Sequence, residues 1–158
     1  MGNTEMFVSI ITLTYKNFSK IRETISSVLI QDYSNVEYII SDDGSPEFPE
    51  QEIIRYIETN KPIGFRYRII HHKQNMGTVR HLNLVYTEAK GDIIMPLACG
   101  DEFYSNNIVS EIVNRFYVKG SDIICGSRCL VNENGQEIRK MPRVTYLAKI
   151  KKLKTAEK

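Results

Sequence analysis

Short apolar runs alternate with amphipathic stretches along this chain, and the alternation limits the folds open to it. The apolar runs predict strands at 7–14, 36–41, 65–71, 93–98 and 123–131. Apolar residues at helical spacing predict helices from about 19 to 29 and at 49–59, 78–89 and 105–117. Strands that alternate with helices favour right-handed crossovers. The sequence therefore predicts an α/β fold, with an open, mostly parallel sheet and helices on both faces.

The C-terminal part of the chain has a different pattern. Residues 132–135 (Asn-Glu-Asn-Gly) predict a hairpin turn, with a short return strand at 136–139. We therefore expect one domain over residues 1–140 and a basic tail over 141–158. The tail has apolar residues at roughly helical spacing among its lysines, so it is either a helix against the domain or a contact with an anionic membrane surface.

Composition and charge exclude some classes of function. The 158 residues include 21 basic and 19 acidic residues, so the net charge is +2 and does not favour nucleic acid as a partner. The three cysteines, Cys99, Cys125 and Cys129, form an odd set without a visible signal peptide, which predicts reduced thiols in a cytoplasmic protein. We expect Cys125 and Cys129 in or near a buried strand rather than in a zinc site.

Acidic residues follow two of the predicted strands directly. Asp42 and Asp43 end one strand, and Asp101 with Glu102 ends another. Each pair has a structural interpretation, because aspartate caps turns and stabilises helix N-termini. Each also has a functional one. Asp42 could accept hydrogen bonds from a base or ribose, and Asp101 could bind Mg²⁺ or Mn²⁺ while substrate phosphates complete the coordination.

Other residues near the predicted strand ends suit a nucleotide. Gly77 precedes a predicted helix, whose free N–H groups would attract phosphate, and Arg80 in its first turn could pair with a diphosphate. Tyr15 follows the first strand and could stack on a base. The three histidines, His71, His72 and His81, have no neighbouring nucleophile or base, so we interpret them as structural or solvated.

Four segments, taken in order, resemble the N-terminal half of the inverting nucleotide-sugar glycosyltransferases of the GT-A fold. The segments are V-S-I-I-T-L-T-Y from Val8, I-I-S-D-D-G-S from Ile39, the N-x-G-x5-N helix from Asn75 and A-K-G-D-I-I from Ala89. The resemblance covers about residues 6–130. It implies a Rossmann-like sheet of the GT-A type and the donor-binding part of an enzyme that is truncated here.

The resemblance also implies roles for individual residues. Thr14 and Tyr15 would flank the nucleobase, Asp42 would accept the base N–H with Asp43 nearby, and Gly77 and Arg80 would lie near the diphosphate. Asp101 would hold a divalent metal, Mn²⁺ or Mg²⁺, within a D-x-D-type motif. Cys99 replaces the first acid of that motif.

The resemblance implies a glycosyltransferase that uses a nucleotide-diphosphate sugar, UDP-linked or related. Its acceptor would be a glycan or lipid-linked hydroxyl in bacterial polysaccharide or lipopolysaccharide synthesis, and its location cytoplasmic or peripheral at the inner membrane. Glu102 is a weak candidate for the catalytic base, because no acceptor half follows Gly135. The alternative is a non-catalytic nucleotide-sugar binding module. A phospho-receiver domain fits less well, because the third strand ends in His71 and His72 rather than an aspartate.

Overall fold

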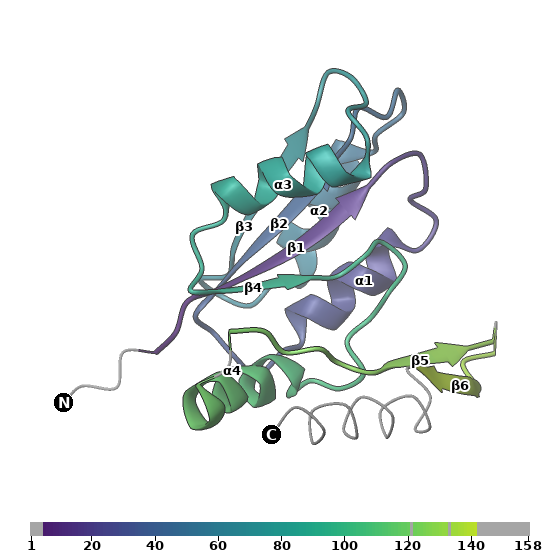
Figure 1. Cartoon of the computed structure of the whole chain (residues 1–158). Coiled ribbons are helices and arrows are strands. Elements are labelled where there is room, and N and C mark those ends of the chain that lie inside the picture. Colours follow the sequence, from purple (N-terminus) through teal and green to yellow (C-terminus); the bar gives the residue numbers. More distant parts are fainter. Residues whose placement is uncertain (1–4, 121, 133, 142–158) are drawn as a thin grey trace, which may run out of the picture. The chain divides into compact units, whose positions relative to one another are not determined.

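The computed structural model describes residues 5–120, 122–132 and 134–141 (Figure 1). The chain forms two compact units, residues 1–119 and 120–158, which are described separately. The expected domain over 1–140 thus spans a unit boundary at residue 120. The expected basic tail lies outside the described residues, apart from Met141. Within the part of the chain that is described, no helix has both the length and the apolar character needed to cross a membrane.

The first unit contains a four-stranded parallel sheet with the order β3-β2-β1-β4. Its strands are β1 (Val8–Thr14), β2 (Val36–Asp42), β3 (Arg66–His71) and β4 (Ile93–Pro96). Its helices are α1 (Ile21–Leu29), α2 (Glu50–Asn60), α3 (Thr78–Glu88) and α4 (Ile108–Lys119). These elements confirm the predicted α/β class and the parallel sheet, with boundaries shifted by a few residues. Within the described residues β4 is an edge strand, and Pro96, which cannot donate a ladder hydrogen bond, is its last residue.

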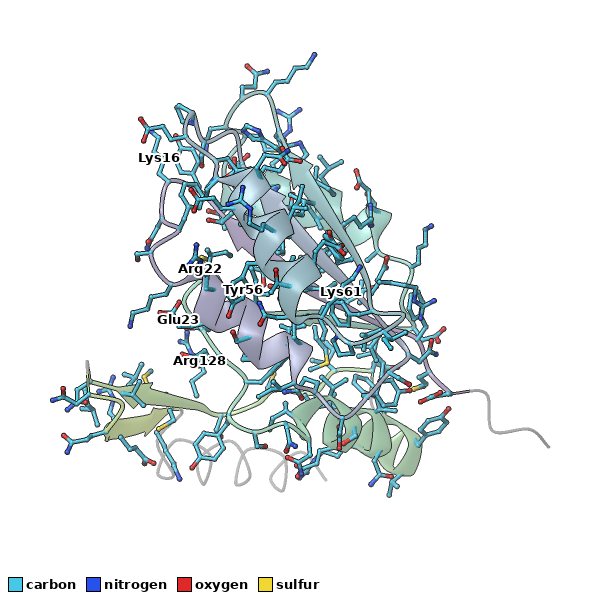
Figure 2. The ribbon with its side chains drawn as sticks, turned by 180° about the vertical axis from the view of Figure 1, so that it is seen from behind. Lys16, Arg22, Glu23, Tyr56, Lys61 and Arg128 are labelled. Atoms are coloured by element: carbon cyan, nitrogen blue, oxygen red, sulfur yellow. The ribbon has the colours of Figure 1, made fainter. Side chains whose placement is uncertain are left out.

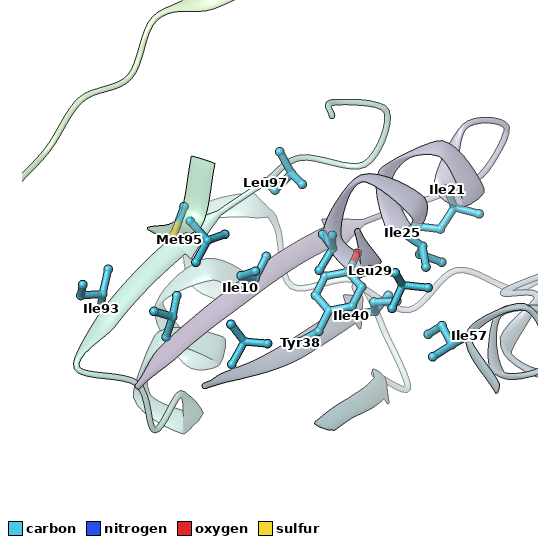
Figure 3. Close-up of a cluster of buried hydrophobic side chains, with 14 of the residues drawn as sticks. Ile10, Ile21, Ile25, Leu29, Tyr38, Ile40, Ile57, Ile93, Met95 and Leu97 are labelled. Carbon is cyan, nitrogen blue, oxygen red and sulfur yellow. The ribbon is translucent and has the colours of Figure 1, made fainter. Parts of the chain in front are cut away.

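Two apolar layers cover the two faces of this sheet. Side chains of β1, β2 and β4 pack against α1, α2 and α4 on one face; this larger cluster includes Ile10, Ile25 and Tyr38, all fully buried (Figure 3). On the other face, Ile11 and Ile39 pack against Val85 of α3. Successive strand residues point to opposite faces, so the continuous apolar runs of β1 and β2 fit a sheet covered on both sides.

The strand order reverses direction at β1. The chain moves from β1 to β2 and β3 on one side, then crosses back through α3 to place β4 on the other side of β1. In open α/β sheets, ligands usually bind outside the carboxyl ends of the strands at such a reversal. In this chain the two strands at the reversal are β1 and β4, and the segments that follow them lead to α1 and α4, which pack on the same face of the sheet.

The second unit contains a two-stranded antiparallel hairpin of β5 (Arg128–Val131) and β6 (Glu137–Met141). The predicted turn is confirmed, because Asn132 and Gly135 are hydrogen-bonded across it. The predicted strand from residue 123 is wrong in its first half. The strand β5 begins at Arg128, which pairs with Met141, and residues 123–127 form no strand in the structure. Cys125 is accordingly exposed rather than in or near a buried strand.

Candidate functional site

The segments that follow β1, β2 and β4 meet at one edge of the sheet. The Asp43 amide donates to the Thr14 carbonyl at 3.0 Å, and the Leu97 amide donates to the Ile11 carbonyl at 2.8 Å. These two backbone bonds extend the pairing of β1 with both of its neighbours. The acids that follow β2 and β4 are therefore held at the same rim, on either side of the end of β1.

Asp42 is fully buried at the end of β2, and the protein itself occupies its carboxylate. The Ser45 amide and hydroxyl each donate to it at 2.6 Å, one to each oxygen. His71 Nε2 lies 3.5 Å from the same carboxylate. Asp42 thus stabilises the turn that follows β2, in agreement with its structural interpretation. Its contact with a base stays a prediction.

Asp43 is 3% exposed and holds the loop before α3. Its carboxylate accepts hydrogen bonds from the Asn75 side chain and from the amides of Met76 and Gly77, all at 2.9 Å. The Gly77 amide is therefore already hydrogen-bonded to Asp43, and the contact of Gly77 and Arg80 with a diphosphate stays a prediction. Gly77 and Arg80 line the same surface hollow of about 560 Å³, where Arg80 is exposed.

Gly44 allows the turn after β2 and the loop before α3 to touch. Its φ is +77°, a left-handed conformation that side chains disfavour. A Cβ placed there would lie 2.5 Å from the Gln74 carbonyl carbon and 2.7 Å from the Asn75 nitrogen. Both atoms belong to the backbone, so neither can move aside cheaply. The glycine of the D-D-G-S segment is needed for this approach.

The loop after β1 places Tyr15 at the rim. Tyr15 is 41% exposed, and Lys16 Nζ lies 5.0 Å from the centre of its ring. Lys16 adopts a positive φ of 56°, and its amide donates to the Ser45 hydroxyl at 2.8 Å. The side chain of Thr14 is turned inward and donates to the Asn17 carbonyl at 3.1 Å. Tyr15 is therefore accessible to a ligand, whereas Thr14 shapes the loop.

A separate cavity of about 520 Å³ lies beside this loop, at the starts of α1 and α2. Two cations, Lys16 and Arg22, line it. Arg22 already lies 3.7 Å from Glu52 and 5.5 Å from the Tyr56 ring, and Figure 2 shows it beside Tyr56. The cavity lies at the starts of α1 and α2, away from the segment that follows β4, and we assign it no role.

The segment after β4 presents two acids to solvent. Asp101 and Glu102 are both exposed. Cys99 lies between this segment and the β1 loop, where its thiol donates to the Asn17 carbonyl at 3.3 Å. Burial raises the pKa of the Cys99 thiol, so it stays protonated at neutral pH. A neutral thiol is a poor ligand for a hard cation, so Asp101 is the residue of this motif that offers a carboxylate, and its predicted metal role stays a prediction.

The histidines are bonded to the protein itself. His81 is buried on α3, and its Nε2 lies 2.7 Å from the Ser41 hydroxyl. His72 Nε2 is 3.3 Å from the same hydroxyl. Burial lowers the pKa of His81, so its imidazole is neutral at pH 7. These contacts agree with the structural interpretation of His72 and His81.

Comparison with known proteins decides the family. Residues 9–158 match the domain of glycosyl transferase family 2. The chain belongs to glycosyl transferase family 2. Its curated relatives include an uncharacterized glycosyltransferase of Rickettsia felis, 34% identical over 84% of this chain, and one of Rickettsia bellii, 35% identical over 82%. The aligned region makes up 21% and 18% of these two relatives, so the chain spans about a fifth of their length.

Solved structures confirm the fold of this family 2 chain. A mannosyltransferase of Pyrobaculum calidifontis, in complex with GDP-Man and Mn²⁺, superimposes with a TM-score of 0.64 and 18% identity. It is matched over 82% of this chain and 37% of its own. S. aureus TarS residues 1–349 in complex with UDP gives a TM-score of 0.65 at 19% identity, over 85% of this chain and 38% of its own. The GT-A fold predicted from the sequence is therefore confirmed.

The structure brings Thr14, Tyr15, Asp42 and Asp43 together at the rim, and it also shows polar residues that the sequence analysis missed. Ser45 is 1% exposed and links Asp42 to the Lys16 amide. Thr24 and Ser27 of α1 are also buried. A signal for them exists in the sequence, because both interrupt the otherwise apolar face of α1.

Proposed function

We propose that this chain is the donor-binding part of a glycosyltransferase that uses a nucleotide-diphosphate sugar. The observation that carries the proposal is that the exposed Asp101 and the exposed Tyr15 lie on the segments that follow β4 and β1, the two adjacent strands at which the strand order reverses. The carboxyl ends of the strands at such a reversal are the usual place for a nucleotide in an open α/β sheet. The related structures with UDP, UDP-GlcNAc or GDP-Man support a nucleotide sugar as the ligand.

Each residue at the rim has a proposed task. The Tyr15 ring would flank the base. Asp42 would direct the turn after β2 toward the base, and we also propose that it accepts a hydrogen bond from the base N–H. Asp43 fixes the loop that carries Gly77, and so places Arg80 where its guanidinium can reach a diphosphate. UDP or a pyrimidine relative is the nucleotide we propose.

The residues after β4 fit a divalent metal of the hard class, Mn²⁺ or Mg²⁺. The Asp101 carboxylate makes no hydrogen bond or ion pair with the other described residues, so both oxygens can reach a ligand. A hard divalent ion at a nucleotide is commonly held by one or two carboxylates together with phosphate oxygens, which is the arrangement we propose for Asp101. When bound, such an ion neutralises charge on the diphosphate leaving group.

In the whole protein, we propose transfer of the sugar to an acceptor hydroxyl in bacterial polysaccharide or lipopolysaccharide synthesis. Glu102 is exposed next to Asp101 and is our candidate for the base that takes the acceptor proton. The second candidate function is nucleotide-sugar binding without transfer. The buried, fully bonded Asp42 and Asp43 favour it for this chain, because they cannot serve as bases in this arrangement. The cytoplasmic or membrane-peripheral location is part of the same proposal.

Titration of UDP in the presence of Mn²⁺ tests the metal role of Asp101. We expect binding that EDTA weakens, and we expect Asp101→Asn to weaken binding in Mn²⁺ by about 10- to 100-fold. The reason is that a contact with a charged group contributes roughly 1.5–3 kcal/mol. Isothermal titration calorimetry with UDP, with and without EDTA, measures both effects.

The control for this experiment is Asp122→Asn, which removes an exposed carboxylate from the second unit. It should leave UDP binding unchanged in both buffers. Equal UDP affinity of the unmodified chain and Asp101→Asn in Mn²⁺ would contradict the metal role. The absence of any UDP, UDP-sugar or GDP binding would contradict the proposed function as a whole.

A further inference from the structure

Two hydroxyl side chains lie on the buried face of α1, among isoleucines and valines. Thr24 is 0% exposed and Ser27 is 5% exposed. Ile25 and Val28 beside them belong to the large apolar cluster of the sheet. Burying a hydroxyl without a partner destabilises a fold, so these positions call for an explanation other than packing.

Each of these two hydroxyls both donates and accepts a hydrogen bond. Thr24 donates to the Lys20 carbonyl at 3.3 Å, and Ser27 donates to the Thr24 carbonyl at 2.8 Å. Each hydroxyl proton is thus used within α1, which leaves the oxygen free to accept. The Gly100 amide donates to Thr24 Oγ1 at 2.9 Å, and the Phe103 amide donates to Ser27 Oγ at 3.2 Å.

Gln31, just past the end of α1, continues the same contact. Its amide nitrogen donates to the Ser105 carbonyl at 2.9 Å, and its oxygen accepts from the Val109 amide at 3.2 Å. Positions 24, 27 and 31 are three and four residues apart, a spacing that places side chains on one side of a helix. Together they bind the backbone from Gly100 to the first turn of α4.

Asp101 and Glu102 lie between the two amides that α1 binds. The Asp101 carboxylate itself has no hydrogen-bond partner among the described side chains, and its amide bonds only to the Ala98 carbonyl, at 2.9 Å, within the same turn. The place of this carboxylate therefore depends on the backbone on either side of it. That backbone is fixed at Gly100 and Phe103 by Thr24 and Ser27.

We propose that Thr24 and Ser27, assisted by Gln31, are positioning residues for Asp101. They hold the segment after β4 in the conformation that binds a metal–nucleotide complex, without touching the ligand themselves. This inference rests on the proposed function for the metal role of Asp101. The hydrogen bonds by which Thr24 and Ser27 fix the segment after β4 do not depend on any ligand.

Amide hydrogen exchange, measured without a ligand, tests whether Thr24 and Ser27 fix the segment after β4. In Thr24→Val, which keeps the side-chain volume but removes the acceptor, the Gly100 amide should exchange about 5- to 30-fold faster. Ser27→Ala should do the same to the Phe103 amide. Thr24→Ser keeps an acceptor oxygen and should restore slow exchange to within about twofold. NMR of the 158-residue chain resolves both amides.

The matched control is Thr12→Val. Thr12 is equally buried and shares a hydrogen bond of 3.0 Å with the Tyr38 hydroxyl, but it makes no hydrogen bond to the segment 97–109 in the described structure. It should lower stability without changing exchange at Gly100 or Phe103. This variant separates a general loss of stability from a local loss of position.

UDP affinity measured in Mn²⁺ and in EDTA gives the second readout. Thr24→Val and Ser27→Ala should reduce affinity in Mn²⁺ about 5- to 30-fold and leave affinity in EDTA unchanged, with recovery in Thr24→Ser. Unchanged exchange in both variants, or equal changes in Thr12→Val, would overturn the positioning role. Faster exchange without a loss of affinity in Mn²⁺ would also overturn it. If the unmodified chain binds no nucleotide, the proposed function fails, and exchange alone still decides whether α1 holds the segment.

Discussion

Gly44→Ala should destabilise the chain by about 2–5 kcal/mol. A positive φ at a residue with a side chain costs roughly 1–2 kcal/mol, and forcing a methyl group into a packed site costs typically 1–3 kcal/mol. Both costs apply here, because φ is +77° and the new Cβ would lie 2.5 Å from the Gln74 backbone. The midpoint of urea unfolding, followed by circular dichroism, measures the change in the free energy of unfolding.

Gly64→Ala is the matched control for this substitution. Gly64 has a φ of +79°, nearly that of Gly44, but a Cβ there would meet no atom within 4 Å. It should therefore cost only the conformational part, about 1–2 kcal/mol. If the two variants unfold at the same urea concentration, the close approach of the two loops is not what requires Gly44.

Asp43→Ala should cost about 2–4 kcal/mol and should also release the loop before α3. The substitution leaves the Asn75 side chain and the amides of Met76 and Gly77 without their acceptor, and a buried donor left unpaired costs about 1–3 kcal/mol. Part of that cost is recovered when the loop moves and water reaches the amides. Chemical denaturation measures the loss of stability, and faster amide exchange at Met76 and Gly77 measures the release.

Asp92→Ala provides the comparison. Asp92 accepts one hydrogen bond, from the Phe7 amide at 2.8 Å, at an exposed position. Water can replace that acceptor, so we expect a loss of less than about 1 kcal/mol. A similar loss in both variants would mean that Asp43 is no more than a surface acceptor.

The sequence predicted the strands and helices of the first unit because their periodicity is local. The continuous apolar runs of β1 and β2 suit a sheet that is covered on both faces, and the packing of Ile10 on the α1 side and of Ile11 on the α3 side confirms it. The start of β5 was missed because strand length depends on a partner. Within the described residues the hairpin pairing begins at Arg128, and an apolar run alone does not contain that information.

The site was predicted less completely, since hydrogen-bond direction depends on tertiary contacts. The acids after β2 and β4 were predicted to follow neighbouring strands, but β1 lies between these two strands in the sheet. The sequence could not show that Asp42 faces its own turn or that Asp43 captures the Gly77 amide. Nor could it show that Thr24 supports a backbone amide 76 residues further along the chain.

The strand order also bears on the order of folding. One helix separates β1 from β2 in the sequence, whereas α2, β3 and α3 also lie between β1 and β4, so β4 pairs with β1 over a much longer stretch of chain. Contacts between the segments after β1 and β4, such as that of Cys99 with Asn17, span 82 residues of sequence and have a correspondingly high cost in loop-closure entropy. Docking of β4 is thus expected to be a late event. A nucleotide that binds only when β4 is paired with β1 would stabilise that pairing. On nucleotide binding, the slowing of amide hydrogen exchange should therefore be greatest in the residues of β4.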